Sequence, residues 1–133
     1  MNPPSVEGLL ETVLYCPSER LNDMRRFYSD VLGLRAVFEK HPLAFRLGNG
    51  LLLVFAADDS SVQDDPPPHG ATGSIHTCLV ASPEAYEEWK TYLPEHDVEI
   101  RREIRWPGGR RSIYFSDPAG NLLEIADGDF WPR

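Results

Sequence analysis

The apolar positions change their period several times along the first half of the chain. Residues 9–16 are apolar or β-branched around one charge, which is typical of a buried strand. Apolar residues at helical spacing then predict a helix over residues 18–32, with Ser18 as its N-cap and Gly33 as its left-handed stop. The pair Asn49-Gly50 predicts a tight turn between two strands. Three short strands are expected, over residues 34–39, 43–47 and 51–55.

The same order of elements returns in the second half. Residues 57–72 lack periodicity and contain several Pro and Gly residues, so we interpret them as a linker. A strand at residues 74–80 is followed by a helix that Ser82 caps and Pro94 ends. Three further strands are expected, over residues 98–106, 111–115 and 121–126. The pattern predicts an α+β protein, a single domain over residues 1–133, with two βαβββ modules at about 8–56 and 73–130.

Counting gives the register between the two modules. Glu11 and His76 take equivalent places in their first strands, 65 residues apart. Leu53 and Glu124 take equivalent places in the closing strands, 71 residues apart, and a longer hairpin around residues 107–110 accounts for the difference. Neither module could bury an apolar sheet face alone, so we expect the modules to pack together or against a partner chain.

Composition and charge exclude several classes of function. With 133 residues and a net charge of −8, the chain is an unsuitable partner for nucleic acid. No apolar run approaches the roughly 20 residues of a membrane span, and the N-terminus lacks the pattern of a signal peptide, so we expect a cytoplasmic protein. Cys16 and Cys78 are too few for a disulfide framework and are expected to be small buried side chains. We interpret the arginines at positions 101, 102, 105, 110 and 111 as a solvated hairpin face rather than an anion groove, because acidic residues interrupt them.

Three ionisable residues lie where strand alternation predicts an inward side chain: Glu11, His76 and Glu124. A buried carboxylate without a partner costs several kcal/mol. Two carboxylates and an imidazole relieve that cost together if they share a divalent cation, and three protein ligands leave positions open for substrate. The alternative is a structural histidine in a strand and a Glu124 that faces solvent. The residues alone leave both interpretations open.

Two motifs resemble a known family. Residues 26–34, RFYSDVLGL, resemble the helix end of the glyoxalase, bleomycin-resistance and extradiol-dioxygenase proteins, the vicinal oxygen chelate superfamily. Residues 111–124, RSIYFSDPAGNLLE, are similar to the closing hairpin of that family, and especially to the hairpin of its fosfomycin-resistance group. The resemblance covers about residues 9–125. It implies that the two βαβββ modules form a U-shaped cup of eight strands.

The resemblance also implies a site. The family's ligand positions fall on Glu11, His76 and Glu124, and the ion would be Mn, Zn, Ni or Fe. Leu53 stands where glyoxalase I has a fourth ligand, so chemistry of the typical glyoxalase I kind is not expected. Ser112 and Tyr114 match residues that contact substrate in the fosfomycin-resistance group.

Tyr15 and Arg46 are candidate substrate-binding residues, although Tyr15 could be a core aromatic and Arg46 a partner in a rim salt bridge. Two functions follow as hypotheses. The first is a metal-dependent enzyme acting on a small oxygenated substrate, by isomerase, lyase, transferase or ring-cleaving dioxygenase chemistry. The second is a protein that sequesters a drug or metabolite without catalysis. The resemblance further implies a homodimer.

Overall fold

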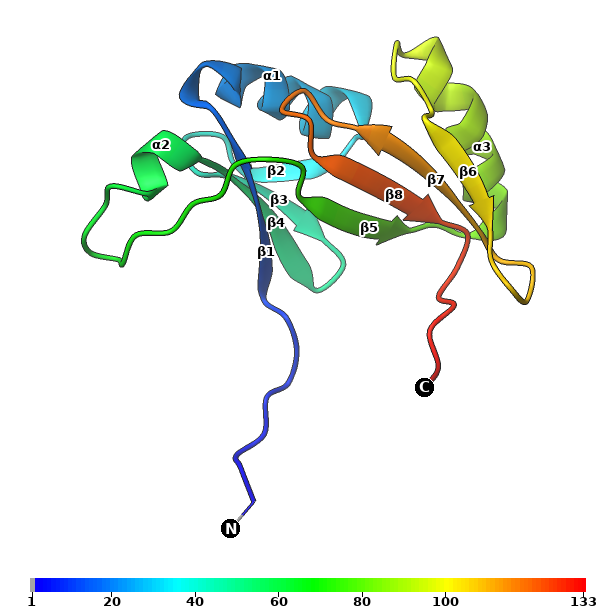
Figure 1. Ribbon diagram of the computed structural model, residues 1–133, viewed down its shortest axis with the longest axis horizontal. Coiled ribbons are helices and arrows are strands. Elements are labelled where there is room, and N and C mark those ends of the chain that lie inside the picture. Colours follow the sequence, from blue (N-terminus) through cyan, green and yellow to red (C-terminus); the bar gives the residue numbers. More distant parts are fainter. Residues whose placement is uncertain (1) are drawn as a thin grey trace. The chain divides into compact units, whose positions relative to one another are not determined.

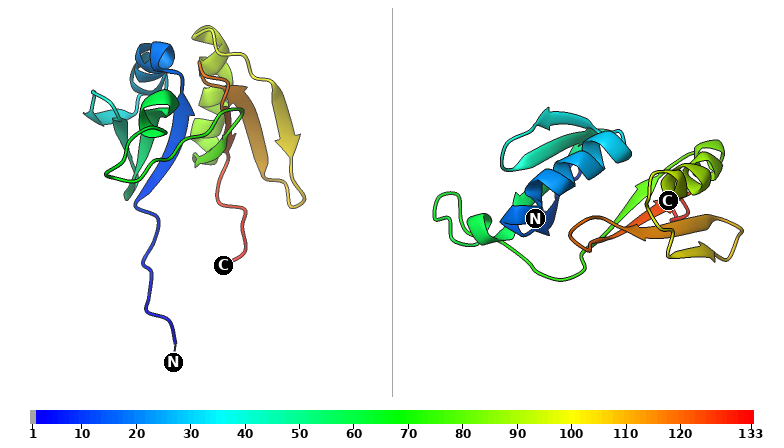
Figure 2. Two further views of the ribbon diagram at one scale, coloured as in Figure 1. Left: turned by 60° about the vertical axis from the view of Figure 1, so that its left-hand side comes forward. Right: turned by 90° about the horizontal axis from the view of Figure 1, so that it is seen from above.

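The computed structural model describes residues 2–133 and divides into two compact units, one ending at Ala71 and the other beginning at Thr72 (Figure 1). The boundary lies at the end of the predicted linker. In the two further views each unit shows a sheet with helical segments on one of its faces (Figure 2). Within residues 2–133, no helix is long and apolar enough to cross a bilayer.

The first unit contains a four-stranded sheet in the order β1-β4-β3-β2. Strand β1 runs parallel to β4, and the other neighbours are antiparallel. Between β1 and β2 lie three consecutive helical segments, namely η1, α1 and the π-helical η2. The elements are β1 (Glu11–Cys16), η1 (Ser18–Arg20), α1 (Leu21–Arg26), η2 (Phe27–Val31), β2 (Arg35–Phe38), β3 (Leu43–Leu47), β4 (Gly50–Ala56) and α2 (Ala57–Ser60).

The second unit repeats this topology, with the strand order β5-β8-β7-β6 and a parallel β5–β8 pair. Its elements are β5 (His76–Val80), α3 (Pro83–Glu95), β6 (Arg102–Arg105), β7 (Arg111–Ser116) and β8 (Leu122–Ala126). The prediction of two βαβββ modules is therefore confirmed. The predicted register is confirmed too, because Glu11 lies opposite Leu51 just as His76 lies opposite Leu122.

Each sheet buries the face that carries its helix. In the first unit Met24 and Tyr28 are fully buried, and the ring of Tyr28 lies 5.7 Å from that of Phe45. In the second unit Tyr86 and Leu93 of α3 are fully buried, and the Tyr86 hydroxyl donates to Glu103 of β6 at 2.6 Å. Because side chains alternate along a strand, the other face of each sheet carries the remaining residues. The candidate site residues lie on that second face.

The first helical segment begins differently from the prediction. Pro17, and not Ser18, precedes η1, and no side chain caps it. The backbone N–H of Ser18 donates to Oδ1 of Asp58 at 3.1 Å, and its hydroxyl donates to the same carboxylate. The Ser18 hydroxyl, which was predicted to cap the helix, therefore donates to the Asp58 carboxylate of α2 instead. Segment 57–72, predicted to be a linker without periodicity, therefore contains a short helix that is hydrogen-bonded to the first residue of η1.

The hairpin between β3 and β4 is shifted by one residue from the prediction. Its turn residues are Gly48 and Asn49, and Gly50 already pairs with Leu47. Gly48 supplies the positive φ, at 56°, that the tight turn requires. Gly50 is needed for another reason: a Cβ there would lie 3.0 Å from the carbonyl oxygen of Leu10.

The second unit also departs from the predicted bounds. Ser82 caps α3 as expected, by accepting from the N–H of Ala85 at 3.1 Å. Pro94, expected to end the helix, lies inside its last turn, and Asp97 takes the left-handed conformation with φ 61°. Strand β6 begins at Arg102, four residues later than predicted, since residues 98–101 carry no strand.

Candidate metal centre

The site begins with a row of side chains across the second sheet. In the strand register Glu124 of β8 lies opposite Cys78 of β5 and opposite Tyr114 of β7. Register partners point to the same face of a sheet. His76, two residues before Cys78, therefore lies on this face as well, which is the face away from α3.

His76 and Glu124 form a close pair. Nε2 of His76 lies 3.1 Å from Oε1 of Glu124, and Nδ1 lies 2.9 Å from the carbonyl oxygen of Leu122. A carbonyl oxygen can only accept, so Nδ1 is the donor in that contact. Nε2 faces a carboxylate oxygen, which can only accept, so this contact needs either a proton on Nε2 or a metal cation between the two atoms.

The second carboxylate oxygen of Glu124, Oε2, has no hydrogen-bond partner among the described residues. The residue is 5% exposed, and its Oε2 makes no hydrogen bond with any part of the chain from residue 2 to residue 133. An orphaned carboxylate oxygen in a buried position costs free energy of the order of a few kcal/mol. A divalent cation bound by Oε2 and the imidazole would remove that cost.

The neighbours of Glu124 are neutral at pH 7. Desolvation, followed by the negative charge of Glu124, raises the pKa of the Cys78 thiol to about 12. The same two causes raise the pKa of the Tyr114 hydroxyl to about 12. The ring of Tyr114 stacks beside His76 with 6.1 Å between centroids. Neither group supplies a positive charge, so the charge of Glu124 can be balanced only by His76 or by a bound cation.

The donor set suits a divalent metal. One imidazole nitrogen and carboxylate oxygens are ordinary ligands of Mn²⁺, Fe²⁺, Ni²⁺ and Zn²⁺. Among residues 2–133 no three His, Cys, Asp or Glu side chains already form a complete ligand group. The structure brings together two of the three predicted ligands, His76 and Glu124. Glu11, the third, belongs to the first unit, where it opens β1 with an exposed side chain.

The first unit has an equivalent face. Glu11 lies opposite Leu51, which in turn lies opposite Arg46, so these three share one row. Arg46 is exposed. Leu53 occupies the place equivalent to Glu124 and is 7% exposed, so this position carries a buried apolar side chain.

Tyr15 lies on the same face, and its partner was missed in the sequence. Its hydroxyl oxygen is 2.6 Å from Nδ1 of His69, and the rings of His69 and Phe55 meet edge to face at 4.6 Å. His69 lies 54 residues away in a segment without periodicity, so no sequence pattern could have paired it with Tyr15. Tyr15 is half-buried and is therefore neither a core aromatic nor a free surface residue.

Ser112 and Tyr114 differ in accessibility. Both lie on the face of Glu124, as predicted from strand alternation. Tyr114 is half-buried, whereas Ser112 is fully buried, and its hydroxyl accepts from the indole N–H of Trp106 at 2.9 Å. Ser112 thus fixes the end of the β6–β7 hairpin. Cys78 was expected to be buried but is exposed, because it shares the open face with Glu124.

Comparison with known proteins gives the family. The model of the Glyoxalase/Bleomycin resistance protein/Dioxygenase superfamily matches residues 13–125. The chain belongs to this superfamily. The first motif's resemblance and the fold are thereby confirmed.

Several relatives are informative. A crystal structure of a lactoylglutathione lyase from Agrobacterium tumefaciens is 37% identical, with a TM-score of 0.85, over 97% of this chain and 98% of that chain. The metallothiol transferase FosB of Staphylococcus saprophyticus is 27% identical over 80% of this chain and 69% of its own length. The fosfomycin resistance protein FosX of Mesorhizobium loti shares the fold, with 17% identity and a TM-score of 0.67, over 95% of this chain and 96% of that chain. The proximity to the fosfomycin-resistance group is therefore supported.

Proposed function

We propose that this protein is a divalent-metal-dependent enzyme that acts on a small oxygenated substrate. The observation that carries the proposal is the buried Glu124 carboxylate, whose Oε2 has no hydrogen-bond partner and whose Oε1 faces Nε2 of His76 at 3.1 Å. We propose Glu11 as the third ligand, because it holds in β1 the place that His76 holds in β5. Mn, Zn, Ni or Fe would each suit one imidazole and two carboxylates.

A bound divalent ion would act as a Lewis acid that stabilises negative charge on substrate oxygens. The chain's own residues would do the rest. Nδ1 of His76 donates to the Leu122 carbonyl and so fixes both the tautomer and the ring orientation. Tyr114 keeps its proton at neutral pH and can donate a hydrogen bond to a substrate oxygen near Glu124. With Ser112 already engaged by Trp106, Tyr114 is the stronger candidate for that role.

The relatives narrow the reactions worth testing. The relatives' names include lactoylglutathione lyase and metallothiol transferase, and both refer to thiol compounds. We therefore propose that a thiol or a thiol adduct is one reactant. Leu53 in the place of a fourth ligand argues for a three-ligand centre, which leaves more positions for substrate oxygens than a four-ligand centre does.

A homodimer belongs to the same proposal. Large apolar side chains are exposed on both units, including Leu10 at 69%, Val80 at 70% and Trp131 at 74%. We propose that a second copy of the chain covers some of these side chains, which would remove their apolar surface from water. Sedimentation velocity should give a mass of about twice 15.0 kDa, and a monomer at all concentrations would contradict this part.

The experiment that tests the function is metal retention. Purified protein is loaded with Mn²⁺, Zn²⁺, Ni²⁺ or Fe²⁺ in turn, desalted, and analysed for metal per chain. One ion per chain is expected for the wild type and for the control Glu99→Gln, which changes an exposed carboxylate outside the site. Glu124→Gln and Glu11→Gln should each lower retention at least tenfold. Retention of less than one tenth of an ion by the wild type with all four metals would overturn the proposal, and saturable binding of an aromatic ligand by that metal-free protein would favour sequestration.

A further inference from the structure

The strap, which we define as residues 57–70, contacts the end of the first sheet. The N–H of His69 donates to the carbonyl oxygen of Ser60 at 3.1 Å, which closes the strap into a loop. The ring of His69 meets that of Phe55 edge to face, and its Nδ1 lies 2.6 Å from the hydroxyl oxygen of Tyr15. One side chain of the strap therefore occupies the Tyr15 hydroxyl.

The imidazole of His41 binds the residue at which the strap leaves the sheet. Strand β4 ends at Ala56, and the strap begins at the next residue. The last pair between β3 and β4 is Leu43 with Val54, and two residues further on the N–H of Ala56 donates to Nε2 of His41 at 2.9 Å. The imidazole thus continues the ladder beyond the end of β3. Ala56 is fully buried, so water cannot take the place of this acceptor.

The hydrogen bond between Ala56 and His41 depends on the charge of the imidazole. A backbone N–H can only donate, so Nε2 must present a lone pair and no proton. In an imidazolium both ring nitrogens are donors, and two donors would then face each other beside a buried N–H without an acceptor. The bond is therefore present while the ring is neutral, and it is lost as the pH falls through the range, around pH 6.5, in which an imidazole ordinarily takes up a proton.

The charged groups around His41 add to this effect. The pKa of Asp58 in α2 lies below its ordinary value, chiefly because the Ser18 hydroxyl donates to it and in smaller part because of the charge of a protonated His41. An imidazolium would therefore attract the carboxylate that otherwise accepts from Ser18 of η1. Glu39 and Lys40, which precede His41 in the same turn, are both exposed and carry opposite charges.

His69 does not share this dependence on charge. The rings of His41 and His69 both meet Phe55 edge to face, with 5.5 and 4.6 Å between centroids. The partner of His69 is the hydroxyl of Tyr15, and a hydroxyl can either donate or accept. Protonation of His69 would therefore leave its hydrogen bond in place, with Nδ1 as the donor.

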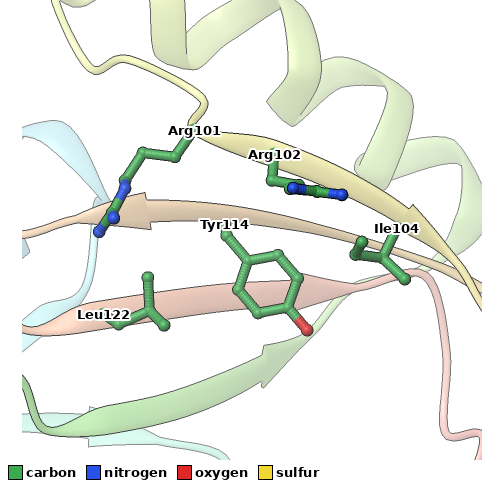
Figure 3. Close-up of a pocket in the computed structure, with 5 residues that line it drawn as sticks. All are labelled: Arg101, Arg102, Ile104, Tyr114 and Leu122. Atoms are coloured by element: carbon green, nitrogen blue, oxygen red, sulfur yellow. The ribbon is translucent and has the colours of Figure 1, made fainter.

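We propose that His41 is an acid-sensitive latch, which holds the strap on the first sheet while it is neutral and releases the strap when it is protonated. Release would withdraw His69 and free the hydroxyl of Tyr15, which lies on the same face of β1 as Glu11. Tyr114 of the second unit needs no such step, because it lines a hollow of about 430 Å³ (Figure 3). Under the proposed function, on which this consequence alone rests, low pH would make a second tyrosine available to the substrate.

The test is amide hydrogen exchange in the metal-free protein at about pH 7.5 and about pH 5, on either side of the ordinary imidazole pKa. Protection factors are compared, because they remove the intrinsic effect of pH on exchange. Protection of the Ala56 amide should fall at least tenfold at the lower pH, and the amides of Ser61 and His69, which donate within the strap, should follow. In His41→Gln a carbonyl oxygen can accept from Ala56 without taking up a proton, so protection should change less than twofold.

The matched control is His69→Gln, which removes the other imidazole at Phe55 and leaves the latch intact. Its Ala56 amide should lose protection at low pH as in the wild type. His41→Phe keeps a ring but no acceptor, so its Ala56 amide should be weakly protected at both pH values. The amides of β7, in the second unit, report whether each variant remains folded.

Three results would overturn the latch. They are a change of less than twofold at Ala56 in the wild type, an equal fall in His41→Gln, and disappearance of the fall in His69→Gln. The experiment uses no metal, so any of these results leaves the metal proposal standing. A failure of metal retention likewise leaves the latch standing.

Discussion

Replacing Asp117 should weaken the turn that aligns the two strands of the candidate metal centre. Asp117 is 5% exposed and precedes β8. Its Oδ1 accepts from the N–H groups of Ala119 and Asn121, at 2.9 and 3.0 Å, and its Oδ2 accepts from the Asn121 amide at 2.9 Å. Asn121, which is 1% exposed, in turn accepts from the N–H of Ile75 at 3.4 Å. Ile75 is the residue directly before β5. Through Asn121, the Asp117 carboxylate therefore connects the start of β8, which carries Glu124, with the start of β5, which carries His76.

The expected cost follows from these three bonds. Hydrogen bonds to a charged group contribute about 1.5–3 kcal/mol each, and truncation recovers part of that when water enters the turn. We therefore expect Asp117→Ala to lower the free energy of unfolding of the second unit by about 3 kcal/mol, and Asp117→Asn by about half as much, since one carbonyl acceptor remains. All three tryptophans, at positions 89, 106 and 131, belong to this unit, so their fluorescence reports its unfolding in urea.

The control for this prediction is Asp129→Ala. Asp129 accepts from the N–H of Trp131 at 3.0 Å and pairs with Arg133, but its side chain is 49% exposed. Exposed pairs contribute little, so a change below about 1 kcal/mol is expected there. A loss of less than 1 kcal/mol in Asp117→Ala, or equal losses in both variants, would refute the reasoning.

Two further predictions concern pH and a close backbone approach. Burial raises the pKa of Asp127, but hydrogen bonds from the backbone and guanidinium of Arg111 outweigh it and leave the pKa below its ordinary value. The contribution of this carboxylate to stability is therefore present above about pH 4 and is lost as the pH falls through its folded pKa. Urea unfolding should show a smaller acid loss in Asp127→Asn than in the wild type, while Asp129→Asn follows the wild type; identical pH curves for all three would contradict this. Gly50→Ala should cost about 1–2 kcal/mol, because its Cβ would meet the Leu10 carbonyl at 3.0 Å, and an unchanged midpoint of thermal unfolding would exclude the clash.

Much of the fold could be predicted because two signals agree along the chain. Strand periodicity and turns at glycine or proline located the eight strands. Counting gave Glu11 and His76 equivalent positions in β1 and β5, and the structure pairs them with equivalent residues, Leu51 and Leu122. Such patterns are local, and a sheet register depends on them directly. The capping of α3 by Ser82 was predictable for the same reason.

The errors arose where distant residues decide the local structure. Ser18 is of a residue type that often caps helices, but its hydroxyl donates to Asp58, 40 residues away in the sequence. The β3–β4 turn slipped by one residue because Gly48 and Gly50 both flank Asn49, and sequence alone does not say which of them takes the positive φ. Of the candidate site, the His76–Glu124 pair followed from strand alternation, whereas the contact of His69 with Tyr15 has no local signature.

Anomalous scattering from a crystal soaked in Mn²⁺ is the most direct test of the central claim. We expect one manganese peak at about 2.0–2.3 Å from both Nε2 of His76 and a carboxylate oxygen of Glu124, with a Glu11 carboxylate as a further ligand. The 3.1 Å contact between His76 and Glu124 should then give way to the ion. A crystal without that peak, with the two side chains still in direct contact, would contradict the account.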